Sequence, residues 1–115
     1  MDIRKEECKN LIDTLFEDKF AQNDLGFDAT VELELEKLIV GGHSFGGMTA
    51  IAVSECDERV KATVTLDPWL WIVVEKIDSR EYKVNTAQCH VLSEGFSPEV
   101  EKRMDFNTVK LIKHL

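Results

Sequence analysis

The chain has 115 residues, of which 43% are hydrophobic and 31% charged, which suffices for one globular domain and not for two. Its 22 acidic and 14 basic residues give a formal net charge of -8 with no basic cluster, which argues against binding to nucleic acid or to an anionic membrane surface. No segment has the length and apolar character of a transmembrane helix, and the first residues contain no apolar signal core.

The chain begins with an amphipathic pattern that predicts a helix over residues 2–20. The apolar residues at helical spacing are Ile3, Cys8, Leu11, Ile12, Leu15, Phe16 and Phe20. Residues 21–30 are rich in turn formers and predict a loop. Residues 31–36 (VELELE) fit either an edge strand or a short charged turn.

The middle of the chain alternates between strand and helix patterns. Residues 37–40 predict a buried strand and residues 45–56 predict a helix, which the polar segment 56–59 ends. Residues 60–66 predict the next strand, and an apolar tetrad at residues 70–73 leads into a charged loop that reaches residue 84.

The last third predicts a strand over residues 85–92, then a helix that starts at Ser97-Pro98 and runs to about residue 106. Residues 107–113 predict a fourth strand, because Val109, Leu111 and Ile112 are apolar. This order predicts an α/β fold with a parallel sheet of three to four strands and flanking helices.

Residues 42–47 (GHSFGG) lie between a predicted strand and a predicted helix, and Gly-x-Ser-x-Gly in that setting indicates a nucleophile elbow. Ser44 is the candidate nucleophile, and the N–H of Phe45 is a candidate oxyanion donor. Gly42 and Gly46 are expected where the backbone packs too closely for side chains. A glycine-rich turn without chemistry is the alternative. A phosphate loop is disfavoured because no Gly-Lys-Ser/Thr follows.

Asp67 closes the strand after the elbow, directly before Pro68. Functional groups of parallel sheets gather at the carboxyl ends of the strands, and the acidic triad partner follows the serine in this fold. Asp67 would accept the Nδ1–H of the triad histidine. A turn aspartate before proline is the alternative interpretation.

Residues 38–47 (LIVGGHSFGG) and residues 66–69 (LDPW), with Asp67 placed 23 residues after Ser44, resemble the platelet-activating factor acetylhydrolase family, which comprises the plasma and type II enzymes and their microbial relatives. Arg4 with Cys8, and residues 93–96 (SEGF), resemble it more weakly.

The resemblance implies an α/β-hydrolase that is a calcium-independent carboxylic ester hydrolase with no metal and no cofactor. Family members remove short or oxidised acyl groups from the sn-2 position of phospholipids, like a 1-alkyl-2-acetylglycerophosphocholine esterase, and Ser44 would carry the acyl-enzyme. The implied catalytic residues are Ser44 and Asp67, with Phe45 in the oxyanion hole.

The histidines divide into three expected roles. His43 is expected to point away from the Ser44 hydroxyl and to be structural or pocket-lining, with the role of the base as the less favoured alternative. His90 is expected to be a packed strand histidine. The resemblance places the triad histidine either at His114 or just beyond Leu115. Beside the elbow, three apolar residues are interpreted as core or as a lipid-facing wall: Trp69, Leu70 and Trp71.

The chain departs from the family by lacking the early strand and loop that supply a second oxyanion N–H, and several strands of the sheet. Residues 1–115 are therefore predicted to form a single, incomplete α/β-hydrolase domain, a C-terminal fragment whose exposed strand edges need further sequence or an oligomeric partner. The alternatives are a non-catalytic interaction module that retains the elbow, and a short-chain acyl esterase of the dienelactone-hydrolase type.

Three cysteines, Cys8, Cys56 and Cys89, lie far apart and form no C-x-x-C pair, which argues against a zinc site. Reduced thiols of this kind fit an intracellular setting, so we expect a cytoplasmic protein.

Overall fold

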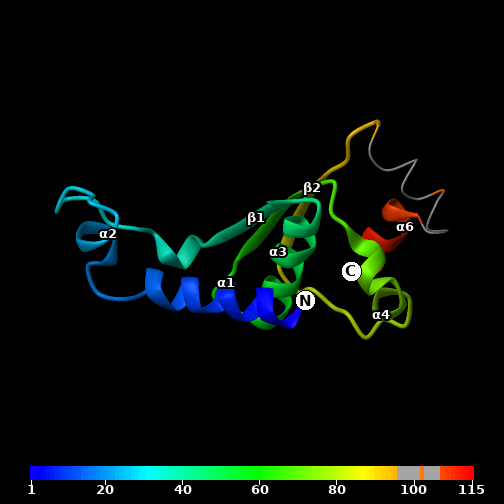
Figure 1. Cartoon of the computed structure of the whole chain (residues 1–115), viewed down its shortest axis with the longest axis horizontal. Coiled ribbons are helices and arrows are strands. Elements are labelled where there is room, and N and C mark those ends of the chain that lie inside the picture. The colour runs from blue at the N-terminus through cyan, green and yellow to red at the C-terminus, as the bar shows by residue number, and fades with distance from the viewer. Residues whose placement is uncertain (96–101, 103–106) are drawn as a thin grey trace.

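The computed structural model describes residues 1–95, 102 and 107–115. At its centre lies a parallel sheet of three strands in the order β1-β2-β3, formed by Ile39–His43, Ala62–Leu66 and Ala87–Val91. Parallel neighbours need crossover connections, and α3 (Phe45–Cys56) makes the first of them, from β1 to β2. Figure 1 shows α3 against the sheet, with α1 (Asp2–Leu15) crossing beside it.

Short helices complete the described structure. The second crossover contains the 3-10 helix η2 (Leu70–Val73) and α4 (Val74–Asp78), and α6 (Thr108–Ile112) packs against α4. Between α1 and β1 the chain forms α2 (Phe20–Asn23) and the 3-10 helix η1 (Leu35–Lys37).

The core is built around α3, whose residues 47–54 are all buried. A helix that is buried all round must be covered on several sides, and here the sheet, α1 and the second crossover cover it. One cluster joins α3 to η2, α4 and α6; it contains Met48, Ile51, Ala52, Leu70, Val73, Ile77, Tyr82 and Leu111. A second cluster joins α3 to α1 through Ile12, Val53 and Val60.

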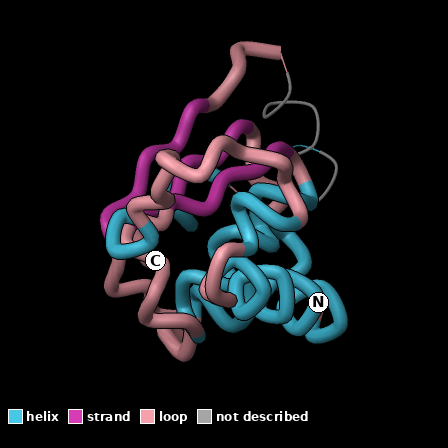
Figure 2. Tube along the Cα trace, turned by 90° about the vertical axis from the view of Figure 1, so that its left-hand side faces the viewer, coloured by secondary structure: helices cyan, strands magenta, loops and turns pink. Residues whose placement is uncertain are grey.

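Only one face of the sheet is covered by these helices. On the other face Ile39, Val64, Leu66 and Val91 are 59%, 39%, 46% and 51% exposed. Figure 2 shows the strands above and the longer helices below. Parallel sheets of globular proteins are ordinarily covered on both faces, so this apolar face is unusual for a parallel sheet.

The helix predicted over residues 2–20 begins as expected but ends at Leu15, and the separate helix α2 occupies part of the predicted loop 21–30. Residues 31–36 form no strand, and η1 begins within them, so the interpretation as a charged turn is confirmed.

The first strand begins two residues later than predicted and runs on through Gly41 and Gly42, because both continue the pairing with β2. The helix predicted over residues 45–56 is confirmed.

Two predictions after residue 70 are wrong. The segment predicted as a charged loop contains α4, because Ile77 is fully buried in the core and anchors a helical turn. The segment predicted as a fourth strand forms α6: the side chain of Asn107 caps it by accepting the N–H of Lys110 at 2.8 Å.

Helical spacing explains the second of these corrections. Thr108 and Leu111 are buried three positions apart, whereas Val109 between them is 47% exposed. The described sheet therefore has three strands, the lower number predicted. Apart from Lys102, the helix predicted from Ser97 to residue 106 lies outside the described residues.

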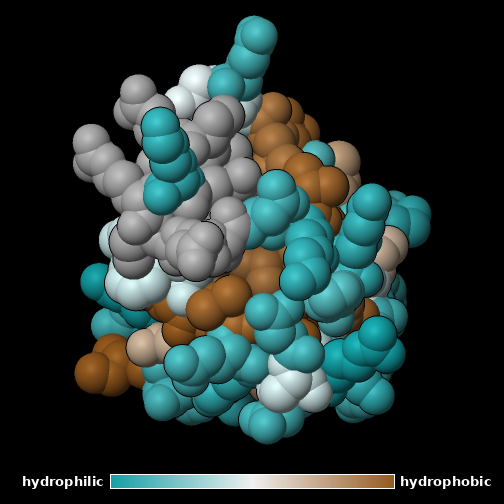
Figure 3. Space-filling view, turned by 90° about the vertical axis from the view of Figure 1, so that its right-hand side faces the viewer, coloured by the Kyte–Doolittle hydropathy of each residue, from teal (hydrophilic) through white to brown (hydrophobic). Residues whose placement is uncertain are grey.

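None of the helices in the described part of the chain has the length and apolar character needed to cross a membrane. Figure 3 views the molecule from the side of α4 and α6 and shows many hydrophilic side chains, with hydrophobic atoms between them.

Candidate active site

Ser44 is the single residue between β1 and α3, and its backbone has φ 54° and ψ −119°. A non-glycine residue at such a φ stores strain of about 1–3 kcal/mol, which persists only where the surroundings hold it. Here the Ser44 N–H donates to the carbonyl of Leu66 at 2.9 Å, and the Ser44 carbonyl accepts the N–H groups of Met48 at 3.2 Å and Trp69 at 2.9 Å. These bonds to the next strand, the helix and the following loop hold the sharp turn that the elbow pattern predicts.

The glycines of the elbow have different roles. A Cβ on Gly42 would lie 2.3 Å from the carbonyl oxygen of Gly46, so this position requires glycine as predicted. A Cβ on Gly46 meets no heavy atom of the described residues within 4 Å, which corrects the prediction for that position. The second tight position is Gly47, whose Cβ would lie 3.1 Å from both the Gly42 oxygen and the Pro68 Cα.

The Ser44 side chain is partly buried, and its hydroxyl makes no hydrogen bond with the described residues. Phe45 is the first residue of α3, so its backbone N–H belongs to the first turn, where N–H groups have no partner inside the helix. The helix dipole adds partial positive charge at the same place. This arrangement can stabilise an anion that forms next to the serine hydroxyl.

Asp67 follows β2 as Ser44 follows β1, and the two strands are hydrogen-bonded neighbours. It is 9% exposed, also has a positive φ of 44°, and donates its N–H to the Val91 carbonyl at 2.9 Å. Its two carboxylate oxygens accept from Ser93, Oδ1 from the backbone N–H and Oδ2 from the hydroxyl, each at 2.7 Å. The carboxylate is thus held by the neighbouring strand end instead of capping its own turn.

The sequence assigned no role to Ser93. A signal was present, because Ser93 lies just after β3 and therefore at the same carboxyl edge of the sheet as Ser44 and Asp67. No local pattern, however, indicates which side chain at that edge meets the aspartate.

An aromatic row runs beside the elbow. The rings of Phe45 and Trp69 meet edge to face at 6.4 Å, and those of Trp69 and Trp71 at 5.1 Å. Leu70 is fully buried in the core, whereas Trp69 and Trp71 are partly exposed. The structure therefore assigns Leu70 to the core and leaves the two indoles beside the candidate site.

His90 and His114 are both engaged elsewhere. The Nδ1 of His90 lies 2.7 Å from the Thr65 hydroxyl, and burial lowers the pKa of His90, so it is packed as predicted. His114 lies 3.5 Å from the Asp78 carboxylate. The Leu115 carbonyl accepts from Val84, which precedes β3, so His114 lies toward the amino ends of the strands.

The structure consequently does not bring His114 to Ser44 and Asp67, which follow the carboxyl ends of their strands. His43, the last residue of β1, has an exposed side chain.

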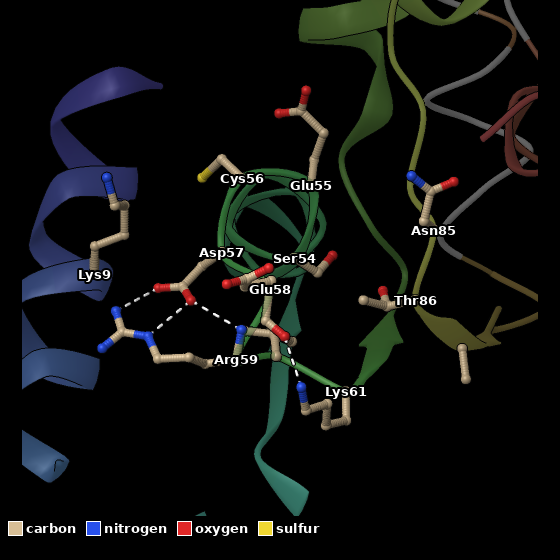
Figure 4. A pocket seen from close by; sticks show the side chains of 12 residues that line it. Lys9, Ser54, Glu55, Cys56, Asp57, Glu58, Arg59, Lys61, Asn85 and Thr86 are labelled. Atoms are coloured by element: carbon tan, nitrogen blue, oxygen red, sulfur yellow. Dashed lines mark hydrogen bonds and ion pairs between the residues drawn. The ribbon is translucent and has the colours of Figure 1, made fainter. Parts of the chain in front are cut away.

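A polar hollow of about 790 Å³ lies at the opposite end of α3. Figure 4 shows Lys9 from α1 beside Asp57 and Arg59 from the segment that follows α3. Arg59 donates to Asp57 from Nε at 2.9 Å and from Nη2 at 2.6 Å, and it also pairs with Asp13 at 2.7 Å. These charges neutralise one another, and neither Ser44 nor Asp67 lines the hollow.

Comparisons with known proteins match most of the chain. A family model described as platelet-activating factor acetylhydrolase, isoform II, matches residues 4–103, a range that contains Ser44, Asp67 and Ser93. A platelet-activating factor acetylhydrolase of Cavia porcellus is 29% identical over 119 aligned positions, covering 88% of this chain and 27% of that protein. The protein of the same name from Bos taurus is 35% identical over 60 positions, covering 50% of this chain and 14% of that protein.

The chain thus spans about a quarter of the length of the first of these relatives. No solved structure matches it. Because the family model covers most of the sequence, including the strained serine and the clamped aspartate, the chain belongs to the platelet-activating factor acetylhydrolase isoform II family.

Proposed function

We propose that this chain carries the nucleophile of a serine esterase that cleaves short sn-2 acyl groups of phospholipids. The observation that carries the proposal is the backbone of Ser44, which is held at a positive φ at the start of α3 by bonds from three separate segments. Backbone strain of this kind is frequent at active sites, and a strained serine on a strand-to-helix turn is the arrangement of a nucleophile elbow.

The proposed reaction is acyl transfer. The Ser44 Oγ attacks the acyl carbonyl while a base takes the hydroxyl proton, and the backbone N–H of Phe45 donates to the oxyanion that forms. Collapse of this intermediate expels the glycerol oxygen, which takes up the proton, and water then cleaves the acyl-enzyme. Asp67 has the role of orienting the base and stabilising its charged form.

We propose that neither His90 nor His114 is the catalytic base. His90 is hydrogen-bonded to Thr65, and His114 lies 3.5 Å from the carboxylate of Asp78, away from Ser44 and Asp67. A histidine of a longer protein or of a partner chain would complete the triad, and without it most of the rate is lost.

The proposed substrate class rests on two supports: the names of the relatives, and the indoles of Trp69 and Trp71 beside the elbow, which offer an apolar wall to an acyl chain. A cytoplasmic location belongs to the same proposal and is supported by three free cysteines.

The test is covalent labelling of the 115-residue chain with a fluorophosphonate probe, with and without added imidazole as a substitute base. We expect slow labelling that imidazole accelerates and that Ser44→Ala abolishes. Folded protein that takes up no probe in either condition, or Ser44→Ala protein that is still labelled, contradicts the proposal. Hydrolysis of p-nitrophenyl acetate but not of an sn-2 acetyl phospholipid would instead favour a general acyl esterase.

A second candidate is a non-catalytic interaction module that keeps the elbow as scaffold. The observation in its favour is the apolar sheet face of Ile39, Val64, Leu66 and Val91, which the described residues leave uncovered. A folded chain that binds a partner and is not labelled by the fluorophosphonate probe would support this candidate.

A further inference from the structure

The carboxylate of Asp67 receives two hydrogen bonds from one residue. The Ser93 backbone N–H reaches Oδ1 and the Ser93 hydroxyl reaches Oδ2, both at 2.7 Å. The N–H···O distance is at the short end of its usual range, and the O–H···O distance is close to the usual value. Two bonds to different oxygens prevent the carboxylate from rotating about its Cβ–Cγ bond.

The backbone of Asp67 is held by the same segment of chain. Its N–H donates to the carbonyl of Val91, two residues before Ser93, at 2.9 Å. The end of β3 thus holds both the main chain and the side chain of Asp67. This clamp also supports the positive φ of Asp67, a conformation that an aspartate adopts only at a cost.

Each carboxylate oxygen can accept about two hydrogen bonds, and Ser93 uses one on each. Among the described residues, no other group bonds to this carboxylate, so an acceptor position remains on Asp67 for the N–H of an imidazole. A carboxylate that cannot rotate keeps this acceptor position pointing in one direction. In a carboxylate that rotates freely, the acceptor position points toward the imidazole only part of the time.

From this geometry we infer that Ser93 is the positioning residue of Asp67. Its hydroxyl fixes the plane of the carboxylate so that the remaining acceptor site faces the base. The inference rests on the proposed function, because it assumes that Asp67 orients a catalytic base. Ser93 bonds to both carboxylate oxygens of Asp67, and its proposed effect on Ser44 is exerted through Asp67.

The rival interpretation is that Ser93 only ties the ends of β2 and β3 together. A double-mutant cycle separates the two. A residue that positions Asp67 loses its effect on Ser44 reactivity once the carboxylate is gone, whereas a residue that only supports the fold keeps its effect.

The experiment measures the rate of fluorophosphonate labelling of Ser44 in the full chain. It is run with or without added imidazole, whichever condition gives labelling of the wild type. We expect Ser93→Ala to slow labelling about tenfold and Ser93→Thr, which keeps the hydroxyl, to restore most of the rate. In an Asp67→Ala background, Ser93→Ala should have no further effect. Ser79→Ala is the matched control, because the Ser79 hydroxyl donates only to the Lys76 carbonyl on the exposed surface.

The outcomes separate this inference from the proposed function. Wild type that is labelled, with Ser93→Ala reacting at the same rate, overturns the role of Ser93 and leaves Ser44 as the nucleophile. An equal slowing in the presence and absence of Asp67 also overturns it. Wild type that is never labelled overturns the proposed function and this inference with it.

Should Ser93→Ala fail to fold, Ser93→Cys keeps the shape and replaces the O–H by a weaker S–H donor. Its labelling is then expected to fall as well, and labelling at the wild-type rate would count against the inference.

Discussion

Ser44 donates its backbone N–H to the carbonyl oxygen of Leu66 across 2.9 Å. This bond continues the pairing of β1 with β2 one residue beyond His43 and Leu66, the last paired residues. The residue after Leu66 is Asp67, so the extension places the strained serine and the clamped aspartate at the same edge of the sheet. The geometry of the candidate site is therefore a consequence of the regular pairing of two parallel strands.

The two flanking glycines of the elbow should respond in opposite ways to alanine. Gly42→Ala places a Cβ 2.3 Å from the Gly46 carbonyl oxygen, and we expect a loss of about 3 kcal/mol in the free energy of unfolding. Gly46→Ala meets no described atom and adds a better helix former, so it should leave stability unchanged or raise it by up to ~1 kcal/mol. Urea unfolding of both variants checks this. Equal losses in both variants would show that Gly46 is also sterically required.

Lowering the pH should destabilise the protein through His90. Burial lowers the pKa of His90 in the folded state, whereas the unfolded residue binds its proton near pH ~6.5. Below that pH the unfolded state therefore binds the extra proton first, and stability falls until the folded pKa is also passed. His90→Asn keeps a hydrogen-bonding side chain beside the Thr65 hydroxyl and does not titrate, so it should reduce the loss of stability between pH 7.5 and 5. An unchanged slope in thermal melts would contradict this.

The Asp57–Arg59 pair should stabilise the fold at neutral pH. Hydrogen bonds from the Arg59 side chain lower the pKa of Asp57, whose own side chain is 5% exposed. The carboxylate therefore adds stability above pH ~3.9 and loses it as the pH falls through the lower folded value. We expect Asp57→Asn to cost about 1 kcal/mol at pH 7, with the difference from wild type shrinking below pH ~4.

The matched control for Asp57 is Glu58→Gln, whose exposed side chain should change stability by less than ~0.5 kcal/mol. Denaturant unfolding at pH 7 and pH 3 measures both variants. A difference between Asp57→Asn and wild type that stays constant with pH would exclude the ionised pair as its source.

The hydroxyl of Tyr82 should be dispensable. Tyr82 is 8% exposed, and its Oη has no hydrogen-bond partner within the described residues. Because a buried hydroxyl without a partner is costly, Tyr82→Phe should keep the packing with the core and raise stability by about 1 kcal/mol. A fall in the thermal midpoint would indicate that the hydroxyl has a partner in solution.

Several features could be predicted from the sequence because they depend on neighbouring residues. The elbow was recognisable because a glycine, a serine and a following helix lie within a few positions, and α3 was recognisable from its continuous apolar run. Both lie in segments whose periodicity is unambiguous. The family resemblance at residues 38–47 and 66–69 was sufficient to indicate the family to which the chain belongs.

Residues 107–113 show where such reasoning fails. Their apolar and β-branched residues fit a strand, but Asn107 caps a helix, which buries Thr108 and Leu111 and leaves Val109 exposed. Short apolar segments satisfy both periods, and the choice is made by the surface against which they pack, in this case α4.

The sequence by itself determined the nucleophile candidate, the helix behind it and the parallel order of the strands, because local periodicity and glycine placement encode them. Only the tertiary structure decided that Gly47 and not Gly46 is the second tight position, that Ser93 holds Asp67, and that His114 lies beside Asp78. Those relationships join segments that lie far apart along the chain or on different strands. The first two arise from how the ends of β1, β2 and β3 are brought together at one edge of the sheet, and the third from the packing of α6 against α4, and no local pattern specifies either.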